Sequence, residues 1–94
     1  MRLKTEEINA IKSTVHNLDQ EATVFLFGSR ADDSKKGGDI DLLVLSGKLA
    51  GGDAKRAIKC ELYKLIGEQK IDILIAADDS DPFVQLALKT GVKL

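Results

Sequence analysis

Two aspartates placed one residue apart constrain this chain more than any other feature. Asp39 and Asp41 open the run DIDLLV at residues 39–44, whose other side chains are all aliphatic. Alternate side chains of a β-strand point to the same face, with Cα atoms roughly 6.5–7 Å apart, so a strand here presents both carboxylates together. Neighbouring carboxylates repel each other unless a cation lies between them. A hard divalent ion such as Mg²⁺, bound through carboxylate and phosphate oxygens, fits such a pair.

A glycine, a serine and an arginine precede this pair and supply donors for phosphate. The apolar run VFLF at residues 24–27 predicts a buried strand that ends at Gly28. Gly28 lets the backbone turn and approach a ligand closely, Ser29 adds a hydroxyl group, and Arg30 offers a planar set of donors. Backbone amides that follow a strand end also bind anions. Phosphate donors beside a metal site describe a site for a nucleoside triphosphate.

This arrangement resembles the signature of the DNA polymerase β nucleotidyltransferase superfamily, in which a glycine-serine pair precedes two acids one residue apart. Gly28 and Ser29, followed by GDIDL at residues 38–42, carry the resemblance. The short length is similar to that of the minimal nucleotidyltransferase branch. The superfamily has a third carboxylate on a later strand, and Asp72 supplies one within the run IDILI at 71–75.

The expected fold is a small two-layer domain of the α/β, or α+β, class. Hydrophobic runs predict strands at 24–27, 39–44 and 71–76, with helices packed over them. The resemblance implies a mixed three-stranded sheet in the order 1-2-3, with the second strand central and Asp41 and Asp72 on neighbouring strands. The third strand is apolar on both faces apart from Asp72, so it is expected to be central or covered on both sides.

Apolar residues at helical spacing predict two helices, over residues 5–19 and 53–66, before and after the first two strands. Thr5 and Asp53 are the expected N-caps of these helices. Leu65 is expected on the buried face of the second helix.

A third helix is predicted to begin after Asp81, with a proline at its first position, and to end at Gly91. Phe83 is expected on its apolar face. The acidic run DDSD at residues 78–81 is interpreted as this helix cap in preference to a second metal site. His16, the only histidine, is interpreted as a residue at the solvent boundary.

Each candidate site residue also has a purely structural explanation. A Gly-Ser-Arg sequence by itself is usually a turn, and Asp39 by itself can cap the loop. Asp41 and Asp72 are different because each lies between aliphatic residues, where an unpaired carboxylate is costly to bury. A shared metal explains both. Lys35 and Lys36 are interpreted as a solvated pair, with contact to a triphosphate as the alternative.

The resemblance implies a two-metal mechanism. It assigns Asp39 and Asp41 to both Mg²⁺ ions, and Asp72 to the ion that activates the acceptor hydroxyl. Residues 28–30 are expected to hold the triphosphate of ATP. Two such ions, roughly 3.5–4 Å apart, stabilise the attacking and leaving oxygens. The acceptor hydroxyl attacks the α-phosphorus, and pyrophosphate is released.

Composition excludes several classes of protein. The 94 residues predict one small domain over residues 1–94. The formal net charge is −1 with no basic stripe, so binding to nucleic acid or to an anionic membrane is not indicated. No run approaches the ~20 apolar residues of a membrane span, and no signal peptide is recognisable. The single cysteine, Cys60, excludes an intrachain disulfide, and a cytoplasmic protein is expected.

The acceptor of the nucleotide is suggested by the resemblance alone. Larger relatives add a helical domain that recognises RNA, DNA or an antibiotic, and none is expected here. The minimal branch typically pairs with a HEPN-type RNase toxin and attaches AMP to a tyrosine of that partner. The resemblance therefore implies a Mg²⁺-dependent adenylyltransferase that uses ATP and acts as an antitoxin.

Two other functions stay open at this point. One is a non-catalytic antitoxin or interaction module that binds nucleotide weakly and silences its partner by contact. The other is a small-molecule nucleotidyltransferase whose acceptor pocket is formed in a homodimer, the default assembly of soluble oligomers.

Overall fold

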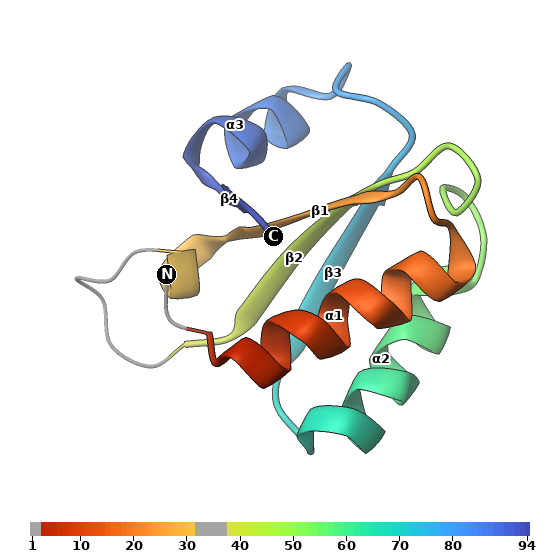
Figure 1. Cartoon of the computed structure of the whole chain (residues 1–94). Coiled ribbons are helices and arrows are strands. Elements are labelled where there is room, and N and C mark those ends of the chain that lie inside the picture. Colours follow the sequence, from red (N-terminus) through yellow and green to blue (C-terminus); the bar gives the residue numbers. More distant parts are fainter. Residues whose placement is uncertain (1–2, 32–37) are drawn as a thin grey trace.

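The computed structural model describes residues 3–31 and 38–94, and within them a four-stranded mixed sheet carries helices on both faces (Figure 1). Lys35 and Lys36, with the rest of 32–37, lie outside the described residues. The elements in chain order are α1 (Thr5–Leu18), β1 (Thr23–Phe27), the 3-10 helix η1 (Gly28–Ala31), β2 (Ile40–Leu45), α2 (Ala54–Ile66), β3 (Ile71–Ala76), α3 (Pro82–Thr90) and β4 (Val92–Lys93). The predicted α+β class is confirmed.

The strand order is β3-β2-β1-β4. β1 pairs antiparallel with both β2 and β4, and β2 pairs parallel with β3. Helix α2 connects β2 to β3 along the chain. The three predicted strands thus have the expected order 1-2-3, and β4, of two residues, adds a fourth strand beside β1. β3 is not central, because it is an edge strand. It is covered on both faces, since Ile71 and Ile73 lie in the main core and Leu74 packs on the core under α3, although residues 74–76 stay half-buried.

The two faces of the sheet are covered unequally (Figure 1). On one face, α1 and α2 lie over the sheet and close the main core, in which Ile11, Leu26, Leu42, Ile58 and Leu62 are fully buried. On the other face, α3 is the one helix that the structure describes, and its Val84 and Ala87 pack on Leu43 of β2. Because alternate residues of each strand serve alternate faces, both cores draw on the same strands.

The helix ends follow the predictions with two corrections. α1 is capped by Lys4 and not by Thr5, since the backbone N–H of Lys4 donates to Oε1 of Glu7 at 2.9 Å. Asp53 precedes α2 but makes no side-chain cap hydrogen bond. Asp81 caps α3 as predicted, because its Oδ1 accepts from the N–H of Phe83 at 2.7 Å.

Two apolar side chains are more exposed than their spacing predicts. Leu65 on α2 is 52% exposed, because the last turn of this helix packs on the core through Ile66 instead. Phe83 on α3 is 54% exposed, although its ring meets that of Phe27 edge-on. Among the described residues, no helix combines the length and the hydrophobicity that crossing a membrane requires.

Candidate active site

The parallel pairing of β2 with β3 sets two of the predicted carboxylates level with each other. Asp41 and Asp72 are register partners in these strands, and register partners point to the same face of a sheet. The next residues on that face, Leu43 and Leu74, pack on the side that α3 covers. The two acids therefore project from the α3 face, at the end of the sheet where β2 and β3 begin.

The turn after β1 brings Gly28 onto this pair of strands. Phe27, the last residue of β1, is the register partner of Asp41, so Gly28 follows directly at the level of the acid. Gly28 has a positive φ of 74° and lies against the Asp41 side chain. The sequence indicates a close approach of the backbone to a ligand at Gly28, and in the structure the atoms that a Cβ at Gly28 would meet are those of the Asp41 side chain.

Charge accumulates at Asp41. Burial raises the pKa of this carboxyl above its usual value, the neighbouring charges of Asp72 and Asp39 raise it further, and Lys70 acts in the opposite direction. A raised pKa means that the ionised form of Asp41 is disfavoured where it stands. A cation at this position would offset both the cost of burying the ionised carboxylate and its repulsion by Asp72 and Asp39.

Lys70 is the one charged neighbour that sequence reasoning missed. Its Nζ lies 3.4 Å from Oδ2 of Asp39, and its backbone carbonyl accepts from the N–H of Ile40 at 3.0 Å. The two side chains of the ion pair are 74% and 38% exposed, so the pair contributes little stability. Its place directly before β3 and two residues before Asp72 was the available signal.

The donor set suits a hard cation, although it does not form a complete cage. Carboxylate oxygens are the ligands that Mg²⁺ prefers, and Asp41 with Asp72 supplies them from adjacent strands. Across the part of the chain that the structure describes, no three acidic, histidine or cysteine side chains form, as they stand, a group that could hold a metal ion. Asp39 contacts Lys70 through one of its carboxylate oxygens, and the positive charge of the lysine opposes a cation beside it.

The residues expected to bind phosphate lie in η1. Arg30 Nε donates to the carbonyl of Gly38 at 3.3 Å, which ties η1 to the residue before Asp39. The side chain of Ser29 lies outside the described residues. Arg30 also lines a pocket of about 370 Å³ together with Leu3, Lys4, Glu7 and Gln69.

A carboxylate in this pocket balances the arginine. Burial by itself raises the pKa of Glu7, but hydrogen bonds from the Lys4 N–H and from Gln69, together with the charge of Arg30, lower it overall. Gln69 Nε2 donates to Oε2 of Glu7 at 3.0 Å. Glu7 is therefore held as an anion, and the pocket presents this one anion beside two cations, Lys4 and Arg30.

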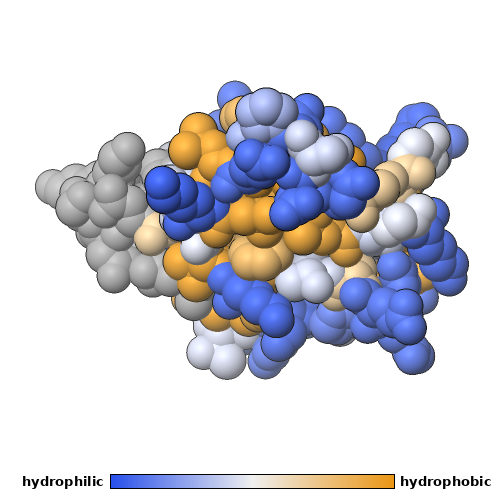
Figure 2. All heavy atoms as spheres, turned by 90° about the horizontal axis from the view of Figure 1, so that it is seen from above, coloured by the Kyte–Doolittle hydropathy of each residue, from blue (hydrophilic) through white to orange (hydrophobic). Residues whose placement is uncertain are grey.

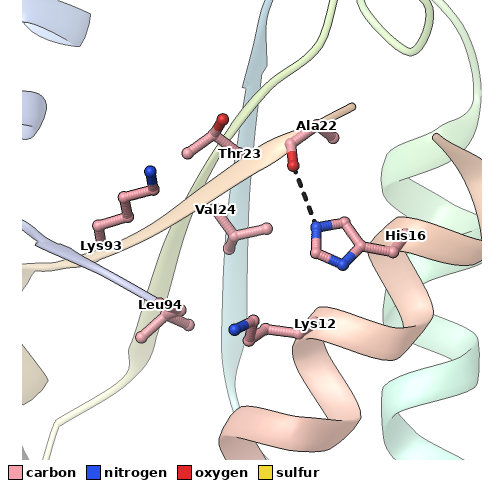
Figure 3. A pocket seen from close by; sticks show the side chains of 7 residues that line it. All are labelled: Lys12, His16, Ala22, Thr23, Val24, Lys93 and Leu94. Atoms are coloured by element: carbon pink, nitrogen blue, oxygen red, sulfur yellow. Dashed lines mark hydrogen bonds between the residues drawn. The ribbon is translucent and has the colours of Figure 1, made fainter. Parts of the chain in front are cut away.

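The remaining candidates lie apart from the acids. A hollow of about 280 Å³ at the edge of the sheet is lined by Lys12, His16, Ala22, Thr23, Val24, Lys93 and Leu94 (Figure 3). The ring of His16 is half-buried and forms a hydrogen bond with the Ala22 carbonyl at 3.1 Å, as Figure 3 shows, which agrees with a boundary residue. In the run 78–81, Asp78 accepts from the N–H of Ser80 at 3.0 Å and Asp81 caps α3, so local turns account for these two acids.

Comparison with known proteins bears on the same residues. The model of the family described as polymerase beta, nucleotidyltransferase matches residues 9–94, a range that includes all three aspartates, Gly28 and Arg30. No curated protein matches the chain. Since the match spans nearly the whole sequence, the chain belongs to the polymerase beta nucleotidyltransferase family.

Proposed function

We propose that this nucleotidyltransferase transfers AMP from ATP to a hydroxyl group of a partner protein. The observation that supports the proposal best is the register of β2 and β3, which sets Asp41 level with Asp72 beside the turn at Gly28. Asp39, Asp41 and Asp72 would hold the Mg²⁺ ions, and Gly28, Ser29 and Arg30 the triphosphate. When bound, such ions polarise the phosphate oxygens and activate the attacking hydroxyl.

The chain's own residues have two tasks in this reaction. Asp41 and Asp72 fix the position of the acceptor oxygen relative to the α-phosphorus, and Asp72, which is exposed, can also take the hydroxyl proton. The donors of η1 and Arg30 neutralise the charge that develops on the leaving pyrophosphate. The oxygen–phosphorus bond forms as the bond between the α-phosphorus and the bridging oxygen breaks, and pyrophosphate leaves.

The proposed acceptor is a HEPN-type toxin, which makes this domain an antitoxin of the cytoplasm, where ATP and Mg²⁺ are available. The support for this part is the resemblance of the motif at residues 28–30 and 38–42 to that of the superfamily, whose minimal branch typically acts on such partners.

A labelling experiment tests the proposal. The purified chain is incubated with Mg²⁺, ATP labelled at the α-phosphate, and the product of the neighbouring gene; label is expected on that protein. Asp41→Asn should abolish the labelling, and Asp53→Asn, an exposed aspartate without a cap bond, should leave it unchanged. Label on a small molecule alone, or equal labelling by the Asp41→Asn variant, would contradict it.

A non-catalytic antitoxin is the second candidate. It is favoured by the contact of Asp39 with Lys70 and by the absence of a complete metal cage among the described residues. In that case the partner would be inhibited at equal strength by the wild-type chain and by Asp41→Asn, with no label transferred.

A further inference from the structure

The outer side of α3 carries two exposed hydrophobic side chains. Phe83 is 54% and Leu86 57% exposed, and residues three apart lie on the same side of a helix. Figure 2, which looks down on the α3 side of the molecule, shows hydrophobic residues gathered in a band across this face, with hydrophilic residues around it. Single exposed leucines are ordinary, whereas a continuous band is typical of an interaction surface.

The sheet beneath α3 is also incompletely covered. α3 has 9 residues and is the one helix described on this face. Beside it, Leu45, Leu74 and Ala76 pack on the small core but stay half-buried. The apolar surface therefore continues from the helix onto β2 and β3, and we call Phe83, Leu86 and these three residues the α3 surface.

Charge is distributed unequally along α3. Asp78, Asp79 and Asp81 lie just before its first residue, and Lys89 lies in its last turn. A helix that is acidic at one end and basic at the other is complementary to a second copy of itself in the antiparallel orientation, and this is the geometry of a twofold interface.

We propose that a second copy of this chain docks on the α3 surface, with the two α3 helices antiparallel across a twofold axis. An axis midway between Phe83 and Leu86 sets each Leu86 on the Phe83 of the second copy. The same axis sets each Lys89 beside the acidic end of the opposite helix, near Asp79. The apolar band and the charge pattern thus lead to the same arrangement.

The expected dimer is weak. At about 1.5 Å per residue, 9 residues make a helix of about 14 Å, which is short for an interface of the standard size of roughly 1,200–2,000 Å². The half-buried residues of β2 and β3 add to the area. We therefore expect a reversible dimer with a Kd in the micromolar range.

The dimer would also border the candidate active site. The rings of Phe83 and Phe27 meet edge-on, with centroids 6.1 Å apart and an interplanar angle of 82°, and Phe27 is the register partner of Asp41. The second copy would thus stand at the rim of the acid pair. The proposal does not depend on catalysis, because oligomeric state is measured without substrate.

Sedimentation velocity over a concentration series, from about 1 µM to about 1 mM, tests the proposal. The weight-average mass should rise from 10.2 kDa toward twice that value. Leu86→Lys should raise the Kd at least about tenfold. Leu65→Lys is the matched control, because Leu65 is 52% exposed on α2, away from the α3 surface, and its replacement should leave the Kd unchanged.

A charge exchange identifies the occupant as a second copy. Lys89→Glu places like charges together and should weaken the dimer several-fold, and the double variant Asp79→Lys/Lys89→Glu should restore it. Both side chains are exposed, and circular dichroism checks that every variant is folded. A wild-type chain that stays monomeric throughout, equal effects of Leu65→Lys and Leu86→Lys, or a double variant no better than Lys89→Glu would each overturn the proposal.

Discussion

The carboxylate of Asp41 occupies the space that a side chain on Gly28 would need. A Cβ on Gly28 would lie 3.2 Å from Cγ of Asp41 and 3.5 Å from its Cβ, closer still to the carboxylate oxygen, and the φ of Gly28 is +74°. The glycine therefore meets two requirements together, a left-handed backbone and room for the acid. The glycine and the acid of the motif form one structural unit, although they are far apart in the sequence.

The replacement of Gly28 by alanine tests this unit. Gly28→Ala should destabilise the protein by about 2–4 kcal/mol, since it adds a collision with Asp41 to the strain of a positive φ. Gly51→Ala is the matched control, because Gly51 has a φ of +82° but open space around its Cβ position. It should cost only the backbone strain, about 1–2 kcal/mol. Equal losses in urea denaturation would show that the collision is relieved elsewhere.

The raised pKa of Asp41 predicts a pH-dependent stability. A group whose pKa is higher in the folded state favours folding below its ordinary pKa of 3.8 and loses that contribution as the pH rises through the folded pKa. Asp41→Asn should therefore stabilise the protein at pH 7, on the order of 1 kcal/mol or less because solvent screens a half-buried group. Its advantage should shrink in melts run toward pH 3. An unchanged melting temperature at pH 7 would contradict the prediction.

The ion pair of Lys70 with Asp39 predicts a competition with metal. Because the positive charge of Lys70 opposes a second cation near Asp39, Lys70→Gln should tighten Mg²⁺ binding a few-fold, the range expected for an exposed pair. Isothermal titration calorimetry of the chain with Mg²⁺ measures this without any turnover. Lys64→Gln is the control, since Lys64 pairs with Glu61 on α2 at 4.0 Å. Weaker binding in the Lys70 variant would instead make the lysine part of the ligand site.

Two aspartates that look equivalent in the sequence should differ when replaced. Asp81 accepts a hydrogen bond from the N–H of Phe83 and Asp53 makes no such bond in α2, so Asp81→Ala should cost about 1 kcal/mol and Asp53→Ala close to nothing. Thermal denaturation of the two variants measures the difference. If both variants melted together, the cap of α3 would be irrelevant to stability.

The acids and the strands could be predicted because their signals are local. The alternation in the run DIDLLV places Asp41 on one face, and the apolar run around Asp72 defines a strand whose bounds, 71–76, match the structure. The prediction that the strands of Asp41 and Asp72 are adjacent rested on the family resemblance, since periodicity carries no information on strand order. The assignment of the acids as metal ligands stays a prediction.

The parts that escaped prediction depend on contacts between distant residues. β4 has two residues, too few for any periodicity, and exists because Lys93 pairs with Phe25 of β1. The contact of Gly28 with Asp41 requires the pairing of β1 with β2. Leu65 and Phe83 obey helical spacing, but their exposure depends on which elements cover them, and that is a property of the whole fold.

The parallel register of Asp41 with Asp72 depends on the number of residues between α2 and β3. Only residues 67–70 separate the helix from the strand. An insertion or deletion of one residue here could shift the register of β3 against β2 by one residue. Asp72 would then point to the face covered by α1 and α2, and Ile71 and Ile73 would point to the α3 face. Selection should therefore conserve the number of residues in this connection even where their identities drift.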